Sequence, residues 1–125
     1  MLSQVIHQQN AVLGAALHGT HVRNDAIQNN IANVDTPGFT ARRVEFESAL
    51  EAAVLNWRTT GQLDLSNARP MVRFQERNHR FRMDASNIDI EREMLALYIN
   101  SVRADVMVNG IMHNSRMLNT VLQGR

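Results

Sequence analysis

Histidines are the side chains in this sequence best suited to metal or acid–base chemistry. His18 and His21 lie three positions apart, so on a helix they would share a face and could supply half of a zinc site. The chain has no cysteine, and no motif supplies the remaining ligands. The other histidines are scattered along the chain, at His7, His79 and His113. We therefore predict no metal site, no cofactor and no catalytic residue among them.

Close pairs of carboxylates are a second possible source of chemistry, because general acid–base catalysis often uses two of them. Glu45 and Glu47 form one such pair in sequence, and Glu91 and Glu93 form another. Neither pair lies in a pattern typical of a hydrolase, and the chain has no glycine-rich loop that could hold a phosphate. We interpret these residues as charges on solvated faces or at a helix start, and we predict that the chain is not an enzyme.

The segment from Arg69 to Arg82 combines positive charge with aromatic rings, a combination that can bind single-stranded nucleic acid. Phe74 and Phe81 are interleaved with its arginines. The whole chain, with 13 basic and 12 acidic residues, has a net charge of +1 and thus no overall field that attracts nucleic acid. Two hypotheses remain: a small helical nucleic-acid-binding module, or an arm that pairs with carboxylates of adjacent subunits. The arm contacts would be Arg73, Arg77, Arg80 and Arg82.

A long N-terminal helix is predicted for the segment that contains His18 and His21. The chain has 125 residues, which indicates one domain at most. No proline interrupts residues 2 to 34, and apolar residues recur at intervals of seven at Ile6, Leu13, Ile27 and Val34, with Thr20 filling the gap. This spacing predicts one amphipathic helix over the segment, which Gly14 and Gly19 each weaken by about 1 kcal/mol relative to alanine.

A second long helix is predicted from about residue 88 to residue 122, with Asn87 as a possible cap. Two rows of residues alternate at spacings of three and four over more than four heptads, which is typical of a coiled coil. We expect a mainly α fold in which the two terminal helices form an antiparallel coiled coil. The residues expected to pack the helices or the assembly are Ile27, Ile31, Met94, Leu97, Ala104, Val108, Ile111 and Leu118. A further apolar row gives this helix a second face to bury, at Leu95, Tyr98, Val102, Val106 and Met112.

The middle of the chain is irregular. Residues 45–57 are expected to form a short helix with one apolar side, made of Phe46, Leu50, Ala53, Val54 and Trp57. Alternating apolar residues within 71–83 indicate a β-hairpin or two extended arms. We therefore divide the chain into an N-terminal helix (1–34), a middle part with turn, short helix and arm (35–87) and a C-terminal helix (88–125), which together form one structural unit.

A defined turn follows the first helix. Asn33 can adopt the left-handed conformation that ends a helix, and the side chain of Asp35 can bond the backbone two residues on. Pro37 and Gly38 suit the central positions of a type II turn, which would present Phe39 for packing. The residues of this motif are Asn30, Asn33, Asp35, Thr36, Pro37, Gly38 and Phe39.

The helix end and turn from Asn29 to Phe39 resemble the N-terminal signature of the flagellar basal-body rod and hook family. The continuation from Ala41 to Phe46 is most similar to the small proximal rod subunits of that family. The stretch from Asn87 to Met94 also resembles the start of their second helix. The similarity covers both ends of the chain and leaves the middle variable.

This resemblance implies a structural subunit of the proximal rod, a hollow helical shaft that crosses the periplasm and transmits torque. It favours an arm that pairs with neighbouring subunits over a nucleic-acid-binding segment. The implied partners are further copies of the chain, a rod paralogue similar to FlgC, and an adaptor similar to FliE at the membrane ring and export gate. It implies no nucleic acid, no small-molecule substrate and no membrane insertion.

The N-terminus gives no sign of a secretory route. Met1 to Gln9 lacks the positive charge and apolar run of a secretory signal, and no stretch approaches the roughly 20 apolar residues of a membrane span. The resemblance implies export to the periplasm through the flagellar type III apparatus without a cleaved signal peptide.

Overall fold

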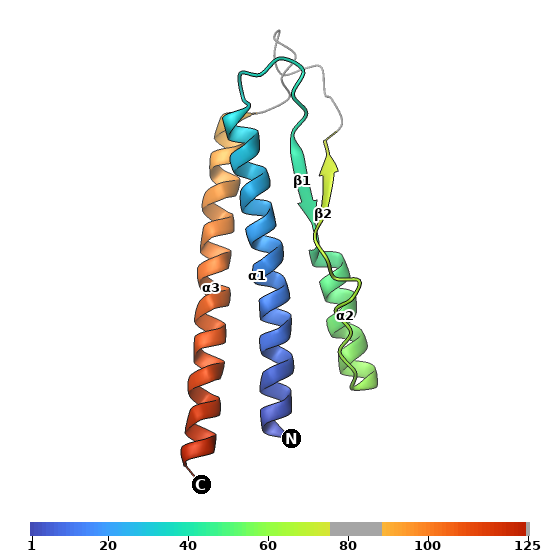
Figure 1. Cartoon of the computed structure of the whole chain (residues 1–125), viewed down its shortest axis with the longest axis vertical. Helices are drawn as coiled ribbons and strands as arrows, with labels where there is room; N and C mark the ends of the chain where they lie inside the picture. Colours follow the sequence, from blue (N-terminus) through green and yellow to red (C-terminus); the bar gives the residue numbers. More distant parts are fainter. Residues whose placement is uncertain (76–88, 125) are drawn as a thin grey trace.

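Two long helices form most of the structure. The computed structural model describes residues 1–75 and 89–124. Helices α1 (Leu2–Ala32) and α3 (Ile90–Gln123) lie side by side and run in opposite directions, so that both chain ends lie at the same end of the molecule (Figure 1). The predicted limits at residues 34 and 88 each differ from these by two residues. The mainly helical fold predicted from the sequence is confirmed.

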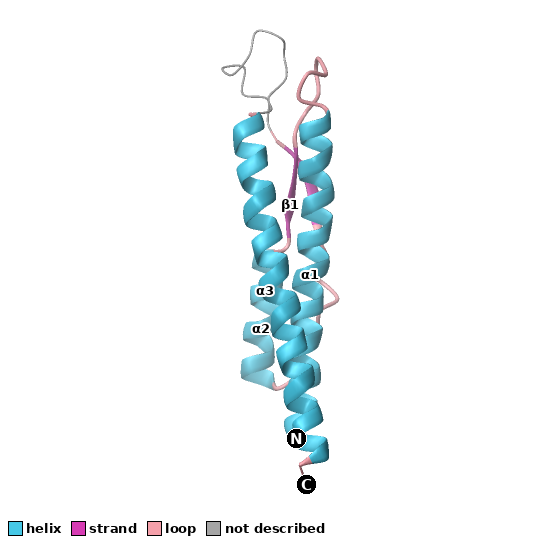
Figure 2. Ribbon diagram, turned by 90° about the vertical axis from the view of Figure 1, so that its left-hand side faces the viewer, coloured by secondary structure: helices cyan, strands magenta, loops and turns pink. Residues whose placement is uncertain are grey.

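A small sheet and a third helix follow α1. Strand β1 (Arg42–Glu45) leads directly into α2 (Glu47–Thr60), and β2 (Met71–Phe74) pairs antiparallel with β1, placing Val44 opposite Val72. Both β1 and α2 contact α1, which therefore forms the centre of the structure (Figures 1 and 2). The extended conformation predicted for the first part of 71–83 is confirmed, but its partner is β1, a strand that was not predicted. The second half of the predicted hairpin lies outside the described residues.

Helix α2 uses the apolar side predicted for it. Phe46, immediately before the helix, is 4% exposed, and Leu50 and Val54 are half-buried. Trp57 is also half-buried, and its indole N–H donates to the Gln8 side chain of α1 at 3.0 Å. The helix ends at Gly61, whose φ of 75° is the left-handed conformation common at a helix end. Apolar burial and one hydrogen bond thus hold α2 along α1.

The buried core is small and lies where β1 and α2 meet α1. Ala16 and Ala26 of α1 pack with Val44 and Phe46, and partly buried neighbours complete the cluster: Val22, Leu50 and Met107. The cluster covers only part of α1, so the rest of the fold depends on the contact between α1 and α3.

None of the helices in the described part of the chain is long and apolar enough to cross a membrane.

Helix α3 turns one of its two predicted rows toward α1. The members of that row are half-buried: Leu97, Ala104, Ile111 and Leu118. In the other predicted row, Met94 is 60% exposed and Val108 is 41% exposed. Both side chains are thus exposed in the single chain, and their expected role in packing the helices or the assembly stays a prediction, now of contacts with other chains.

The second row that faces α1 is mostly polar and lies one position away from the predicted one. Asn100 Nδ2 donates to the backbone oxygen of Thr20 at 2.8 Å, and Asn114 Nδ2 donates to Asn10 Oδ1 at 3.0 Å. The row consists of Glu93, Asn100, Met107 and Asn114, which are buried or half-buried. Polar contacts at intervals along a helix pair disfavour sliding, because a shift would leave buried amides unpaired.

The start of α3 is fixed by an aspartate. Asp89 is extended, and its carboxylate accepts hydrogen bonds from the backbone N–H groups of Glu91 and Arg92. These bonds satisfy two of the donors that a helix start leaves free. Asp89 is thus the N-terminal cap, where the sequence pointed to Asn87, a residue outside the described part.

Candidate functional site

The turn after α1 has the backbone that its sequence predicts. The N–H of Phe39 donates to the carbonyl of Thr36 at 3.2 Å, and Gly38 has a φ of 74°. A type II turn needs this positive φ at its third position, and proline before it fits the preceding φ. Thr36 and Pro37 are exposed, while Phe39 is half-buried. The turn therefore sends the chain from the end of α1 back along its side into β1.

Asn33 ends α1 differently from the prediction. Its φ of −107° and ψ of 18° are not left-handed, which corrects the expected conformation. Instead its side-chain amide donates to the carbonyl of Asn29 at 2.8 Å, and its oxygen accepts from the Thr36 hydroxyl at 3.2 Å. The Asn29 carbonyl also accepts from the backbone N–H of Asn33 at 3.2 Å, so the side chain adds a second bond to a helix end that forms without a left-handed residue.

Asn30 joins α1, β1 and α3 near the C-terminal end of α1. It is fully buried on α1, its Oδ1 accepts from the N–H of Arg42 at 2.8 Å, and its Nδ2 donates to the Arg42 carbonyl at 2.9 Å. The same Nδ2 lies 3.2 Å from Glu93 Oε2 on α3. The Asn30 side chain thus bonds both backbone groups of Arg42, as an adjacent strand would. It also connects β1 to both long helices.

Glu93 completes this cluster, which we call the Asn30 clamp (Asn30, Arg42, Arg43 and Glu93). Glu93 is only 1% exposed, and its Oε1 pairs with Arg43 Nη1 at 2.6 Å. Of the two interpretations given for Glu93, the charge at a helix start is confirmed, since the residue lies in the first turn of α3, and the solvated face is wrong. Its burial is tolerated because an arginine and an amide both bind it. No signal within the sequence near Glu93 reveals these partners, since they lie far away along the chain.

Phe46 forms a second junction, between β1, α2 and α1. Its ring covers Gly19, where a Cβ would lie 2.6 Å from ring atoms, and the Arg23 guanidinium stacks 4.7 Å from the ring centroid. Arg23 also donates to the Val44 carbonyl at 2.7 Å and to Glu47 Oε2 at 2.7 Å. The glycine, read in the sequence only as a weak point of the helix, is what allows Phe46 to approach the backbone of α1.

The ion pair at this junction makes stability depend on pH. The hydrogen bond from Arg23 is the main cause that lowers the pKa of Glu47 from its ordinary 4.5 to about 2. A carboxyl with a lowered pKa in the folded state stabilises the fold fully above its ordinary pKa, and the contribution is lost as pH falls toward the folded value. Glu47 is 52% exposed, so solvent screening limits the effect to about 1 kcal/mol or less.

We expect Glu47→Gln to lower the free energy of unfolding near neutral pH, and we expect most of this effect to be lost as the pH falls to about 2, where the carboxyl of the unaltered folded chain is about half protonated. Urea unfolding of both proteins across this range measures the difference. Glu51→Gln on the exposed side of the same helix is the matched control. A difference between Glu47→Gln and the unaltered chain that stays constant down to about pH 2 would contradict the assignment.

The face of α3 turned away from α1 is apolar. Leu95 is 59% exposed, Tyr98 69%, Val102 44% and Val106 65%. These side chains recur at three and four positions, which places them along one side of the helix. A continuous exposed apolar row of this kind is typical of a surface that contacts another protein.

The structure distributes the remaining predicted residues over both long helices and the sheet. Ile27 is 4% exposed and Ile31 is half-buried on α1. Arg73 on β2 pairs with Glu45 of β1 at 2.7 Å, so it bonds within the chain. Three predicted arm residues lie outside the described part: Arg77, Arg80 and Arg82.

Histidines and carboxylates do not gather into a metal site in the described part of the chain, where no three such side chains lie together. His21 instead faces Asp25 one turn along α1, at 3.7 Å. The features that the structure brings together are thus junctions between elements and an exposed helix face, which suit binding to other protein chains better than catalysis.

Known proteins show the same combination of sequence features. Residues 12–40, which include most of α1 and the turn, match the family described as flagella basal body rod protein. The flagellar basal body rod protein FlgB of Borrelia hermsii is 31% identical over 116 residues, covering 82% of this chain and 86% of that protein. FlgB of Proteus mirabilis is 32% identical over 123 residues, with 86% and 88% covered. FlgB of Bacillus subtilis is 28% identical, with 87% and 88% covered.

Proposed function

The chain belongs to the family of the flagellar basal body rod protein FlgB, and we propose that it works in the proximal rod as part of the hollow shaft that transmits torque across the periplasm. Proteins of this family are structural subunits of the rod and are not known as enzymes. We therefore interpret the exposed surface of this chain as a surface for contacts with other protein chains.

The exposed apolar row of α3 is the observation that carries this proposal. A helix whose opposite face already packs on α1 has no partner within the described residues for Leu95, Tyr98, Val102 and Val106. Burial of apolar area stabilises association by about 25 cal/mol per Å². A second buried face gives each subunit lateral contacts in addition to the contacts within it, as a shaft under torsion requires.

The pairing of α1 and α3 is proposed to be an antiparallel coiled coil. Its support is the spacing of the buried and half-buried residues of α3, which alternate between three and four positions. We further propose that the terminal segments 1–34 and 88–125 and the middle segment 35–87 act as one unit in the rod. The Asn30 clamp supports this, because it joins α1, β1 and α3 by direct bonds.

Partners and location follow from the family. We expect contacts with further copies of the chain, a paralogue similar to FlgC and an adaptor similar to FliE. We also expect export to the periplasm by the flagellar type III apparatus without a cleaved signal peptide. The turn motif and the arm arginines Arg73, Arg77, Arg80 and Arg82 remain predicted contact or positioning residues in that assembly.

Nucleic-acid binding is not proposed. Arg73 is neutralised by Glu45 and Arg43 by Glu93. These two arginines are thus paired within the chain, and the similarity to rod proteins gives no support to this alternative.

The first test is how mass and helicity depend on protein concentration. Analytical ultracentrifugation and circular dichroism of the purified chain, alone and mixed with a FlgC-like protein, should show larger species as concentration rises. A monomer that keeps its mass at every concentration and with the partner would contradict a role as rod subunit.

Val106→Glu tests whether the apolar row is the contact surface. We expect self-association about tenfold weaker or more, because assembly would bury a charge among apolar side chains. Helicity should be unchanged, since Val106 is 65% exposed. Asn119→Glu, an exposed position of α3 outside the row, is the control with the same change of charge. Equal association of Val106→Glu and the unaltered chain would exclude this face.

A further inference from the structure

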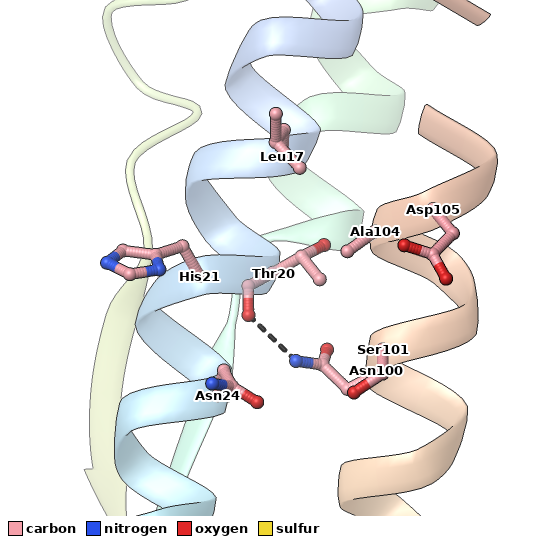
Figure 3. A pocket seen from close by; sticks show the side chains of 8 residues that line it. All are labelled: Leu17, Thr20, His21, Asn24, Asn100, Ser101, Ala104 and Asp105. Carbon is pink, nitrogen blue, oxygen red and sulfur yellow. Dashed lines mark hydrogen bonds between the residues drawn. The ribbon is translucent and has the colours of Figure 1, made fainter. Parts of the chain in front are cut away.

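An open cavity of about 480 Å³ lies between α1 and α3 near the middle of their contact. The small side chains of Ala104 and Ser101 leave this space, and Leu17 and Thr20 form the side that belongs to α1 (Figure 3). The cavity lies on a different side of α3 from the exposed row containing Val106. It is therefore not explained by the contact surface proposed above.

The wall of the cavity contains a hydrogen-bond acceptor without a donor. Asn100 is 2% exposed, and its Nδ2 donates to the Thr20 carbonyl at 2.8 Å (Figure 3). Its Oδ1 is buried and has no hydrogen-bond partner in the described part of the chain. Buried acceptors are normally satisfied, because losing water without a replacement bond is unfavourable. Asn100 Oδ1 is thus a buried acceptor that a hydrogen-bond donor in the cavity would satisfy.

The rim of the cavity has a carboxylate without a cation. Asp105 is exposed and forms no ion pair with another described residue. The only titratable side chain opposite it on α1 is His21, whose ring points away from α3 and faces Asp25 (Figure 3). The amide of Asn24 adds further hydrogen-bonding capacity. A cationic group with several donors would complement this lining better than an apolar or anionic one.

The chain itself provides such a group. All 13 of its basic residues other than histidine are arginines, whose planar guanidinium can bind a carboxylate and donate to further acceptors at once. Several arginines in the described part form no ion pair with another described residue, namely Arg58, Arg69, Arg103 and Arg116. In a rod made of repeated subunits, each copy can place such an arginine against the cavity of the next.

We propose that the cavity between α1 and α3 receives one of these four arginines from a second copy of the chain. Asp105 is the charge partner of the guanidinium, and Asn100 Oδ1 is an acceptor for it. The inference rests on the proposed function, because it requires self-assembly. It adds a specific polar contact that fixes the relative position of two subunits, which an apolar row alone does not specify.

Charge reversal tests the proposal. Asp105→Arg should weaken self-association about tenfold or more in sedimentation, because two cations would meet in the cavity. Asp105→Asn should act in the same direction with a smaller effect. Helicity should be unchanged in both, since Asp105 is exposed and forms no ion pair with another described residue. Glu51→Arg on the exposed side of α2 is the control with the same change of net charge.

Compensating variants identify the partner. Asp105→Arg is combined in turn with Arg58→Asp, Arg69→Asp, Arg103→Asp and Arg116→Asp, and one combination should restore association to within about threefold of the unaltered chain. Normal association of Asp105→Arg alone, or no restoration by any of the four, would overturn the proposal while leaving the rod function intact. Failure of the unaltered chain to associate at all would instead contradict the proposed function.

Discussion

Replacing Gly19 by alanine should destabilise the fold by about 2 kcal/mol, although alanine is the better helix former. The added Cβ would lie 2.6 Å from the Phe46 ring, far inside van der Waals contact. Phe46 is 4% exposed and Arg23 stacks on it, so the ring could move away from the added Cβ only by giving up packed contacts. The cost of overlap therefore exceeds the gain of about 1 kcal/mol in helix propensity.

The measurement is urea unfolding followed by circular dichroism and by fluorescence of the single tryptophan. Trp57 lies on α2, so its emission should report the separation of α2 from α1. Gly14→Ala in the same helix is the matched control, because nothing lies within 4 Å of a Cβ at that position. It should be neutral or stabilising by up to about 1 kcal/mol. Equal effects of the two substitutions would show that Phe46 does not require the glycine.

Asn30→Ala should cost about 3 kcal/mol or more of unfolding free energy. The change removes both bonds to the backbone of Arg42 and one bond to the buried carboxylate of Glu93. Each buried group left without a partner loses roughly 1–3 kcal/mol. The Arg43–Glu93 ion pair would still connect β1 to α3, but Arg42 would lose both of its bonds to α1.

Chemical denaturation of Asn30→Ala should be compared with Asn24→Ala, which removes an amide from the same helix at a half-buried position whose side chain forms no hydrogen bond with another described residue. The control should change stability by about 0.5 kcal/mol or less. A double-mutant cycle with Glu93→Gln measures the coupling between α1 and α3, and we expect it to exceed about 0.5 kcal/mol. Additive effects of the two substitutions would show that the charge of Glu93 contributes nothing to its contact with Asn30.

Local patterns in the sequence were sufficient for several elements. The turn at Thr36–Phe39 depends on proline and glycine at adjacent positions, and its geometry needs no distant partner. The long helices were recognisable because apolar residues recur along them. The apolar side of α2, from Phe46 to Trp57, was predicted correctly for the same reason.

Long-range pairing was not predictable in this way. The β1–β2 sheet joins segments separated by all of α2, and no local turn indicates the partner of β2. The N-terminal cap of α3 lies at Asp89, two residues beyond the expected one. The orientation of α3 was only half predicted, because Leu97 and its row were identified but the polar row of Asn100 was not.

The sequence by itself determined the helices, the turn and the family, because each depends on residues close together in the chain or on a motif that they form. Only the tertiary structure decided that Glu93 is buried, that Gly19 makes room for Phe46 and that Asn100 leaves an acceptor unpaired at a cavity. These properties arise from contacts between residues far apart in sequence. A polar or glycine residue in a helix is compatible with both exposure and burial, and its environment is set by the side chains that fold against it.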